Sequence, residues 1–223
     1  MSNFPSAKNK LFHLPPKGSL VHGNLDDPLR YYYHPLVGFL FRSRVEQALS
    51  LLSPPYESVL EIGYGSGILM PALSSIGKKV YGVDVNSDRS KVTKNLEKIG
   101  VNVELSQSDF IKTPYPDESF DLIVAISIFE HIDNLKEAIS KAFCMLKPGG
   151  HLLVGMPSVS FFMEVASHLV GYHDIKEHHR NNYKQFLALA DDFFNLEHCA
   201  KIPAWFPFDA GLYFNMLLSK IKR

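Results

Sequence analysis

Three glycines at alternate positions, Gly63, Gly65 and Gly67, follow a short apolar run that contains one acidic residue, Glu61. Glycine lets a loop turn tightly and approach a ligand closely, because it has no side chain to collide with. Asp84 closes a second apolar run, about twenty residues further along the chain. A glycine-rich turn after one strand and a carboxylate after the next are typical of a nucleotide-type ligand held at the edge of an open α/β sheet.

The spacing of the glycines distinguishes a dinucleotide from other nucleotide-type ligands. A dinucleotide fingerprint needs a third small residue three positions after its second glycine, and that position holds the bulky, branched Ile68. A nicotinamide dinucleotide is therefore disfavoured. Glu61 stands two residues before Gly63 and would repel a pyrophosphate, whereas it suits a ligand with positive charge, such as an ammonium or a sulfonium.

Short apolar runs and amphipathic segments alternate around these motifs. Strands are expected at residues 58–62, 79–83, 101–105, 120–126, 151–156, 194–202 and 212–219. Helices are expected at residues 36–52, 68–76, 135–146, 157–170 and 183–191, and another is capped by Ser87 and ends at Gly100. The alternation predicts an α/β fold with a doubly wound sheet, mostly parallel. The final connection is too short for a crossover helix, so the last two strands are expected to be antiparallel.

Length and charge limit the possible architectures and partners. The 223 residues are expected to form one domain. We expect a lid and a helix at 1–52, a ligand-binding core at 58–156, a substrate-side insertion at 157–182, and the last helix and strands at 183–223. Lysine plus arginine equals aspartate plus glutamate at 23 each, so no overall positive field attracts nucleic acid, and such a partner is not expected.

Features of a secreted or membrane protein are also missing from the sequence pattern. The first eighteen or so residues are interrupted by lysines and prolines, whereas a signal peptide needs a continuous apolar core. No stretch is long enough to span a membrane without including a charge. Cys144 and Cys199 lie far apart, without metal or redox spacing. We therefore expect a cytoplasmic protein with reduced cysteines and no integral membrane contact.

Taken together, the motifs resemble those of a class I S-adenosylmethionine-dependent methyltransferase, of the small-molecule group similar to methyltransferase type 11. The resemblance covers residues 58–156, with a weaker match at 179–202. It implies a Rossmann-like seven-stranded sheet with an antiparallel C-terminal strand pair. It also implies S-adenosylmethionine as the cofactor, S-adenosylhomocysteine as the product and a small molecule as the methyl acceptor.

The resemblance assigns a role to each motif. The glycine loop receives the methionine part of the cofactor, Asp84 accepts hydrogen bonds from the ribose hydroxyls, and Asp109 receives the adenine amino group. Residues 120–132 match the fourth-strand motif, and residues 146–150 match the turn before the fifth strand. The expected cofactor-binding residues are Glu61, Gly63, Tyr64, Gly65, Gly67, Asp84, Val85, Ser108, Asp109, Phe110, Ile126 and Ser127.

The acceptor side is less explicit. Methyl transfer from a sulfonium can be accelerated by positioning alone, but a hydroxyl or carbon-acid acceptor also needs a base near neutrality. His131 lies just beyond the fourth strand and is the candidate catalytic base, with an architectural role as the alternative. Tyr33, His178 and His179 are candidate substrate contacts, because the N-terminal arm and the segment after the fifth strand close over the acceptor in similar proteins. No metal site is expected, since the histidines of 173–179 lack a regular ligand spacing.

Two alternatives remain open. A methyltransferase fold can be kept as a non-catalytic module for partner binding or cofactor sensing. A nicotinamide-dependent oxidoreductase is the weaker alternative because of Ile68. The acceptor atom, whether oxygen, nitrogen or carbon, and the oligomeric state are not determined by these patterns.

Overall fold

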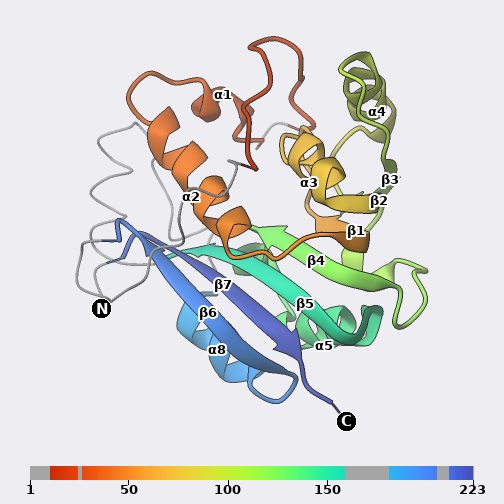
Figure 1. The fold of residues 1–223 in the computed structure, drawn as a ribbon, viewed down its shortest axis with the longest axis vertical. Coiled ribbons are helices and arrows are strands. Elements are labelled where there is room, and N and C mark those ends of the chain that lie inside the picture. The colour runs from red at the N-terminus through yellow and green to blue at the C-terminus, as the bar shows by residue number, and fades with distance from the viewer. Residues whose placement is uncertain (1–10, 25–26, 159–180, 205–210, 223) are drawn as a thin grey trace.

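The computed structural model describes residues 11–24, 27–158, 181–204 and 211–222. Its centre is a seven-stranded sheet in the order β3-β2-β1-β4-β5-β7-β6 (Figure 1). The strands are β1 Tyr56–Ile62, β2 Gly77–Asp84, β3 Glu104–Gln107, β4 Phe120–Ile126, β5 Leu146–Pro157, β6 Phe194–Ile202 and β7 Tyr213–Lys220.

Strands β1 to β5 pair in parallel, and β7 lies antiparallel between β5 and β6. The expected fold class is therefore confirmed. Parallel strands carry their carboxyl ends to one edge of the sheet. The loops that follow β1, β2 and β4 consequently meet there.

Helices cover both faces of the sheet and bury it in two cores. One core receives apolar side chains from the first four helices, and the other receives them from α5 and α8; Figure 1 shows these groups on opposite sides. The α-helices are α1 Leu29–Tyr32, α2 Gly38–Ser50, α3 Met70–Ile76, α4 Arg89–Lys98, α5 Leu135–Met145 and α8 Tyr183–Ala190. Two 3₁₀ turns follow β3 and β4, η1 at Phe110–Lys112 and η2 at Phe129–His131.

The expected cap of α4 was wrong. Asp88 caps this helix, and its carboxylate accepts a hydrogen bond from the backbone N–H of Lys91. The backbone N–H of Ser87 instead donates to the Asp84 carboxylate, at 2.8 Å. Because the turn after β2 closes on Asp84, the helix begins one residue later than the sequence pattern predicts.

Two strand boundaries also differ from the expectation. Gly100 has a left-handed φ of 77°, and the N–H of Val101 donates back to the carbonyl of Leu96. Val101 is therefore hydrogen-bonded back to the last turn of α4, and β3 begins only at Glu104. Strand β5 begins earlier than expected, because Leu146 already pairs with Phe120 across a register shift.

The expected helix at 157–170 lies almost wholly outside the described residues, and Pro157 ends β5. Within the described ranges, no helix combines the length and the apolar character needed to cross a membrane.

Asp121 ties the amino end of β4 to its neighbours. Its Oδ2 accepts hydrogen bonds from the backbone N–H of Ser58 at 2.8 Å, from the Ser58 hydroxyl at 2.8 Å and from Lys147 Nζ at 2.9 Å. Burial alone would raise the pKa of this carboxyl, but the hydrogen bonds from Lys147 and Ser58 outweigh it and hold the pKa below its ordinary value. The ionised form therefore stabilises the fold.

Asp121→Ala is expected to lower the free energy of unfolding at pH 7 by about 2 kcal/mol, because charge-assisted bonds to partly buried groups are lost. The stabilisation is present above the ordinary aspartate pKa and is lost as pH falls through the lower, folded-state pKa. The difference between wild type and variant should therefore shrink in acid. Glu57→Ala, which removes the exposed ion pair with Lys78, is the control and should change stability by less than about 0.5 kcal/mol. Equal losses in both variants under denaturant titration would contradict this account.

Candidate cofactor site at the carboxyl edge of the sheet

The loop after β1 has the backbone that its glycines permit. Gly63, Gly65 and Gly67 all have left-handed φ values, of 75°, 54° and 77°. A Cβ at Gly63 would lie 1.9 Å from Cδ1 of Ile128, which follows β4. A side chain at Gly63 would therefore be strained by the left-handed φ and would require Ile128 to move.

The Asp84 carboxylate joins two loops at this edge. Its Oδ2 accepts from the N–H of Gly65 at 2.9 Å, and its Oδ1 accepts from the N–H groups of Asn86 and Ser87, both at 2.8 Å. The loops after β1 and β2 are thus held by one side chain. A carboxylate offers about four acceptor positions, two on each oxygen, so Oδ2 retains capacity for a ligand hydroxyl.

The carboxyl of Glu61, two residues before the glycine loop, is buried. The residue is 2% exposed, and its Oε2 has no hydrogen-bond partner in the part of the chain that the structure describes. Burial raises the pKa of this carboxyl well above its ordinary value, and the charges of Asp84 and Asp27 raise it further. A buried polar atom without a partner requires an explanation, and a bound cation at the loop supplies one.

The amino-terminal arm packs directly on the glycine loop, and sequence reasoning missed its residues. A Cβ at Gly23 would lie 2.1 Å from the carbonyl oxygen of Gly65. The buried Asp27 carboxylate accepts from the N–H of Gly23 at 2.8 Å and from the N–H of Leu29 at 2.9 Å. Burial raises the pKa of Asp27, although these bonds oppose the shift. The arm was expected to be a lid, but no motif distinguished Asp27 within it.

The residues expected around the adenine also lie at this edge. Asp109 caps η1 by accepting from the N–H of Ile111 at 3.0 Å, and Phe110 is buried beside it. The N–H of Ser108 donates to the carbonyl of Asp84 at 3.0 Å, which links the loops after β2 and β3. Val85 is 59% exposed, so it offers an apolar surface next to Asp84.

The residues after β4 divide into buried and exposed ones. Ser127 has a left-handed φ of 59°, and its N–H donates to the carbonyl of Gly155 in β5 at 2.8 Å. Ile126, the last residue of β4, packs against the core that contains Tyr64. The side chain of His131 is exposed, whereas that of its neighbour Glu130 is buried. The structure therefore brings Ser127 to the site, and the catalytic role of His131 stays a prediction.

The candidate substrate contacts are placed only in part. The Tyr33 hydroxyl donates to the carbonyl of Pro15 at 2.9 Å, so this ring is fixed to the amino-terminal arm. Its neighbour Tyr32 is almost fully buried. His178 and His179 lie outside the described residues. Within the described ranges, no group of three or more His, Cys, Asp or Glu side chains is arranged for a metal ion.

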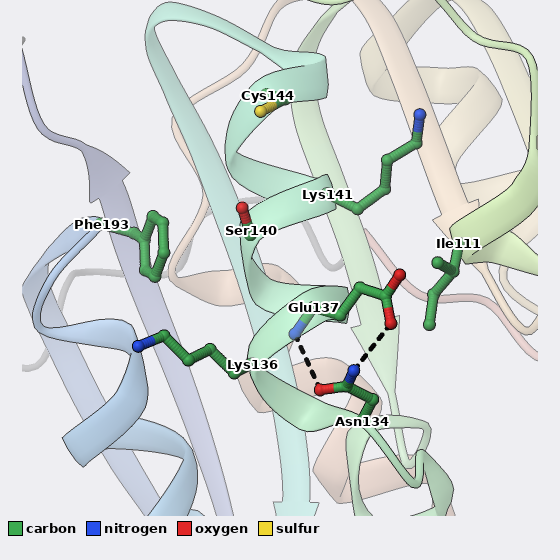
Figure 2. A pocket seen from close by; sticks show the side chains of 8 residues that line it. All are labelled: Ile111, Asn134, Lys136, Glu137, Ser140, Lys141, Cys144 and Phe193. Carbon is green, nitrogen blue, oxygen red and sulfur yellow. Dashed lines mark hydrogen bonds between the residues drawn. The ribbon is translucent and has the colours of Figure 1, made fainter.

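A surface hollow of about 670 Å³ lies elsewhere, along α5 (Figure 2). Its polar groups include Asn134, which caps α5 and is hydrogen-bonded to Glu137, and the lysine side chains of Lys136 and Lys141. None of its lining residues belongs to the expected site. The hollow is an open depression without convergent polar groups, so we do not assign a ligand to it.

Known proteins resemble this chain in both sequence and fold. The profile of a family described as a methyltransferase domain matches residues 60–154. An uncharacterized methyltransferase of Geobacillus thermodenitrificans is 32% identical over 145 residues, which cover 61% of this chain and 66% of the relative. A ubiquinone biosynthesis O-methyltransferase of Coxiella burnetii is 28% identical over 138 residues, which cover 61% and 53%. The matched region thus spans only half to two thirds of these relatives.

Solved structures share the fold at low identity. The N-methyltransferase NodS of Bradyrhizobium japonicum, in complex with S-adenosyl-L-homocysteine, has a TM-score of 0.63 at 17% identity, covering 88% of this chain and 93% of NodS. The PH0226 protein of Pyrococcus horikoshii has a TM-score of 0.67 at 19% identity, covering 85% of this chain and 95% of that protein.

These findings support the family and the cofactor that the resemblance of the sequence motifs implies. The strand order, the loop geometry and these sequence matches support the expected class I S-adenosylmethionine-dependent methyltransferase, with the family match over residues 60–154.

Proposed function

We propose that the protein binds S-adenosylmethionine at the carboxyl edge of its sheet and transfers the methyl group to a small-molecule acceptor, with S-adenosylhomocysteine as the other product. The observation that carries this proposal is the buried carboxyl of Glu61, whose Oε2 has no partner within the described residues. An ammonium group placed over the glycine loop would satisfy it.

Different residues of the site bind different parts of the cofactor. In this proposal, Glu61 and the glycine-loop backbone bind the amino acid end, and Asp84 accepts hydrogen bonds from the ribose. Val85 and Asp109 contact the adenine. The cofactor supplies an electrophilic methyl group on a positively charged sulfur. Because that charge disappears as the methyl is transferred, fixing the two reactants in line is the main task of the protein.

The identity of the acceptor atom is a separate question. The relatives and structural neighbours include proteins named as an O-methyltransferase and as an N-methyltransferase. These names support methyl transfer without selecting between oxygen and nitrogen. A non-catalytic module remains the alternative from the sequence, but the methyltransferase names of the relatives do not favour it.

Asp84→Asn should weaken binding of S-adenosylhomocysteine at least about tenfold, because one charged acceptor of the ribose hydroxyls is lost. Isothermal titration calorimetry measures this directly. Glu97→Ala, on the exposed side of α4 in the same half of the protein, is the matched control and should bind as wild type does. Wild-type affinity in Asp84→Asn would contradict the assignment of the ribose contact.

Cofactor binding should release protons. Burial and the neighbouring carboxylates raise the pKa of the Glu61 carboxyl in the free protein, and an ammonium beside it would lower that pKa by favouring the ionised form. The binding enthalpy should therefore depend on the ionisation enthalpy of the buffer. In Glu61→Gln, the proton release should disappear and affinity should fall. A wild-type enthalpy that is the same in all buffers would exclude this role for Glu61.

A further inference from the structure

One buried polar cluster lies beside the cofactor site and shares Ser127 with it. It consists of Tyr32 in α1, Arg44 in α2, Ser127 after β4, Glu130 in η2 and Tyr213 in β7, and we call it the acceptor-side cluster. It lies next to the cofactor loop, because Ile128, between Ser127 and Glu130, contacts Gly63.

Ser127 is the centre of the acceptor-side cluster. Its Oγ accepts a hydrogen bond from Arg44 Nη1 at 3.2 Å and shares one of 2.8 Å with the Tyr213 hydroxyl. Arg44 Nη2 donates to the Tyr32 hydroxyl at 3.2 Å. One hydroxyl can accept two hydrogen bonds and donate one, so Ser127 can accept from Arg44 and Tyr213 while it donates to Glu130.

The acceptor-side cluster has unsatisfied polar atoms of both kinds. Oε2 of Glu130 and Nε of Arg44 are buried and lack a hydrogen-bond partner among the residues that the structure describes. A satisfied structural ion pair would leave neither atom free. One buried acceptor and one buried donor of the acceptor-side cluster thus have hydrogen-bonding capacity that the described residues do not use.

The backbone around the acceptor-side cluster is also constrained. Ser127 adopts a left-handed φ of 59°, which is uncommon for a residue with a side chain. A Cβ at Gly155 would lie 2.6 Å from the Tyr213 hydroxyl, so only glycine allows Tyr213 to reach Ser127. Strained residues that hold a polar group in place are typical of active sites.

We propose that the acceptor-side cluster makes this protein an O-methyltransferase for acidic hydroxyls, such as phenols or enols, in which Glu130 accepts the hydroxyl proton and Arg44 holds the resulting oxyanion. This inference rests on the proposed function and adds the acceptor class to it.

The charge of Arg44 favours a hydroxyl over an amine. Its guanidinium carbon lies 4.5 Å from the ring centroid of Phe41, 5.5 Å from that of Tyr213 and 5.6 Å from that of Tyr32. These rings reduce access of water, which strengthens the repulsion of an ammonium and the attraction of an oxyanion. The same rings suit the flat, apolar body of a phenol.

The state of Glu130 suits proton transfer. Burial raises the pKa of this 1% exposed carboxyl to about 8, against the opposing effects of a hydrogen bond from its own backbone, of the Arg44 charge and of a hydrogen bond from Ser127. Within the described residues, the groups that bear on it are Arg44 from α2, Tyr213 from β7 and Ser127 after β4. A base with a pKa near the working pH combines a useful ionised fraction with sufficient proton affinity.

The step balances without a further reactant. The hydroxyl O–H bond breaks and its proton passes to the Glu130 carboxylate. The oxygen electron pair forms a bond to the methyl carbon, and the carbon–sulfur bond breaks with its electron pair left on sulfur. The products are a methyl ether, a neutral thioether and protonated Glu130, which returns its proton to solvent.

The test varies the acidity of the acceptor. Wild type, Glu130→Gln, Arg44→Gln and His131→Ala are assayed for S-adenosylhomocysteine formation with phenol, catechol and 4-nitrocatechol, and with a set of primary amines. Glu130→Gln should lower kcat about 100-fold with phenol and catechol, but much less with 4-nitrocatechol, which ionises without help. Arg44→Gln should lower turnover of all three. The rising limb of the wild-type pH profile, near pH 8, should be absent in Glu130→Gln.

Calorimetry with S-adenosylhomocysteine on the same proteins separates the two proposals. Wild-type failure to bind would overturn the proposed function, whereas binding with turnover of amines only, or of no phenol, would overturn the hydroxyl assignment. A loss in Glu130→Gln that is equal for all three phenols would make Glu130 structural. An acidity-dependent loss in His131→Ala instead would assign the base to His131.

Tyr213→Phe provides a second, milder variant if Glu130→Gln does not fold, and should shift the rising limb of the pH profile. Lys136→Ala, on the exposed face of α5, is the control and should match wild type.

Discussion

The arrangement of the cofactor site depends on the hydrogen bonds that the Asp84 carboxylate accepts. It accepts hydrogen bonds from backbone N–H groups of both the loop after β1 and the loop after β2. The backbone carbonyl of Asp84 accepts a hydrogen bond from the N–H of Ser108, which follows β3. The loops after β1, β2 and β3 are therefore all hydrogen-bonded to Asp84, at the end of β2. These bonds organise the edge of the sheet at which the cofactor is proposed to bind.

Opposite charges flank the junction between the loops after β1 and β4. Glu61, Asp84 and Asp27 gather around the glycine loop, where burial raises the pKa of Glu61 and the charges of Asp84 and Asp27 raise it further. Arg44 lies on the other side, within the acceptor-side cluster. The contact between Ile128 and Gly63 stands at this boundary. A cationic donor and an anionic nucleophile would thus each meet the charge that stabilises it, and an apolar side chain marks the boundary between the two.

Sequence patterns predicted the features that depend on neighbours along the chain. The glycine loop, Asp84 and the strands β4 and β6 follow from local periodicity and from the steric freedom of glycine. The wrong prediction for the cap of α4 arose from competing local hydrogen bonds. Ser87 and Asp88 can both cap a helix, and only Asp88 does so here. The acceptor-side cluster could not be found this way, because Arg44 and Tyr213 lie 83 and 86 residues from the Ser127 that they contact. Burial, which gives Glu130 its chemistry, is a property of the packed chain.

The insertion of β7 between β5 and β6 has a consequence for the order in which the protein becomes competent during synthesis. The glycine loop, Asp84 and Asp109 are all made within the first half of the chain, and their strands pair with one another. Tyr213 arrives only with the last strand, which must enter between two strands that are made before it. The acceptor-side cluster therefore depends on a strand pairing that is more distant along the chain than the pairings that assemble the cofactor residues.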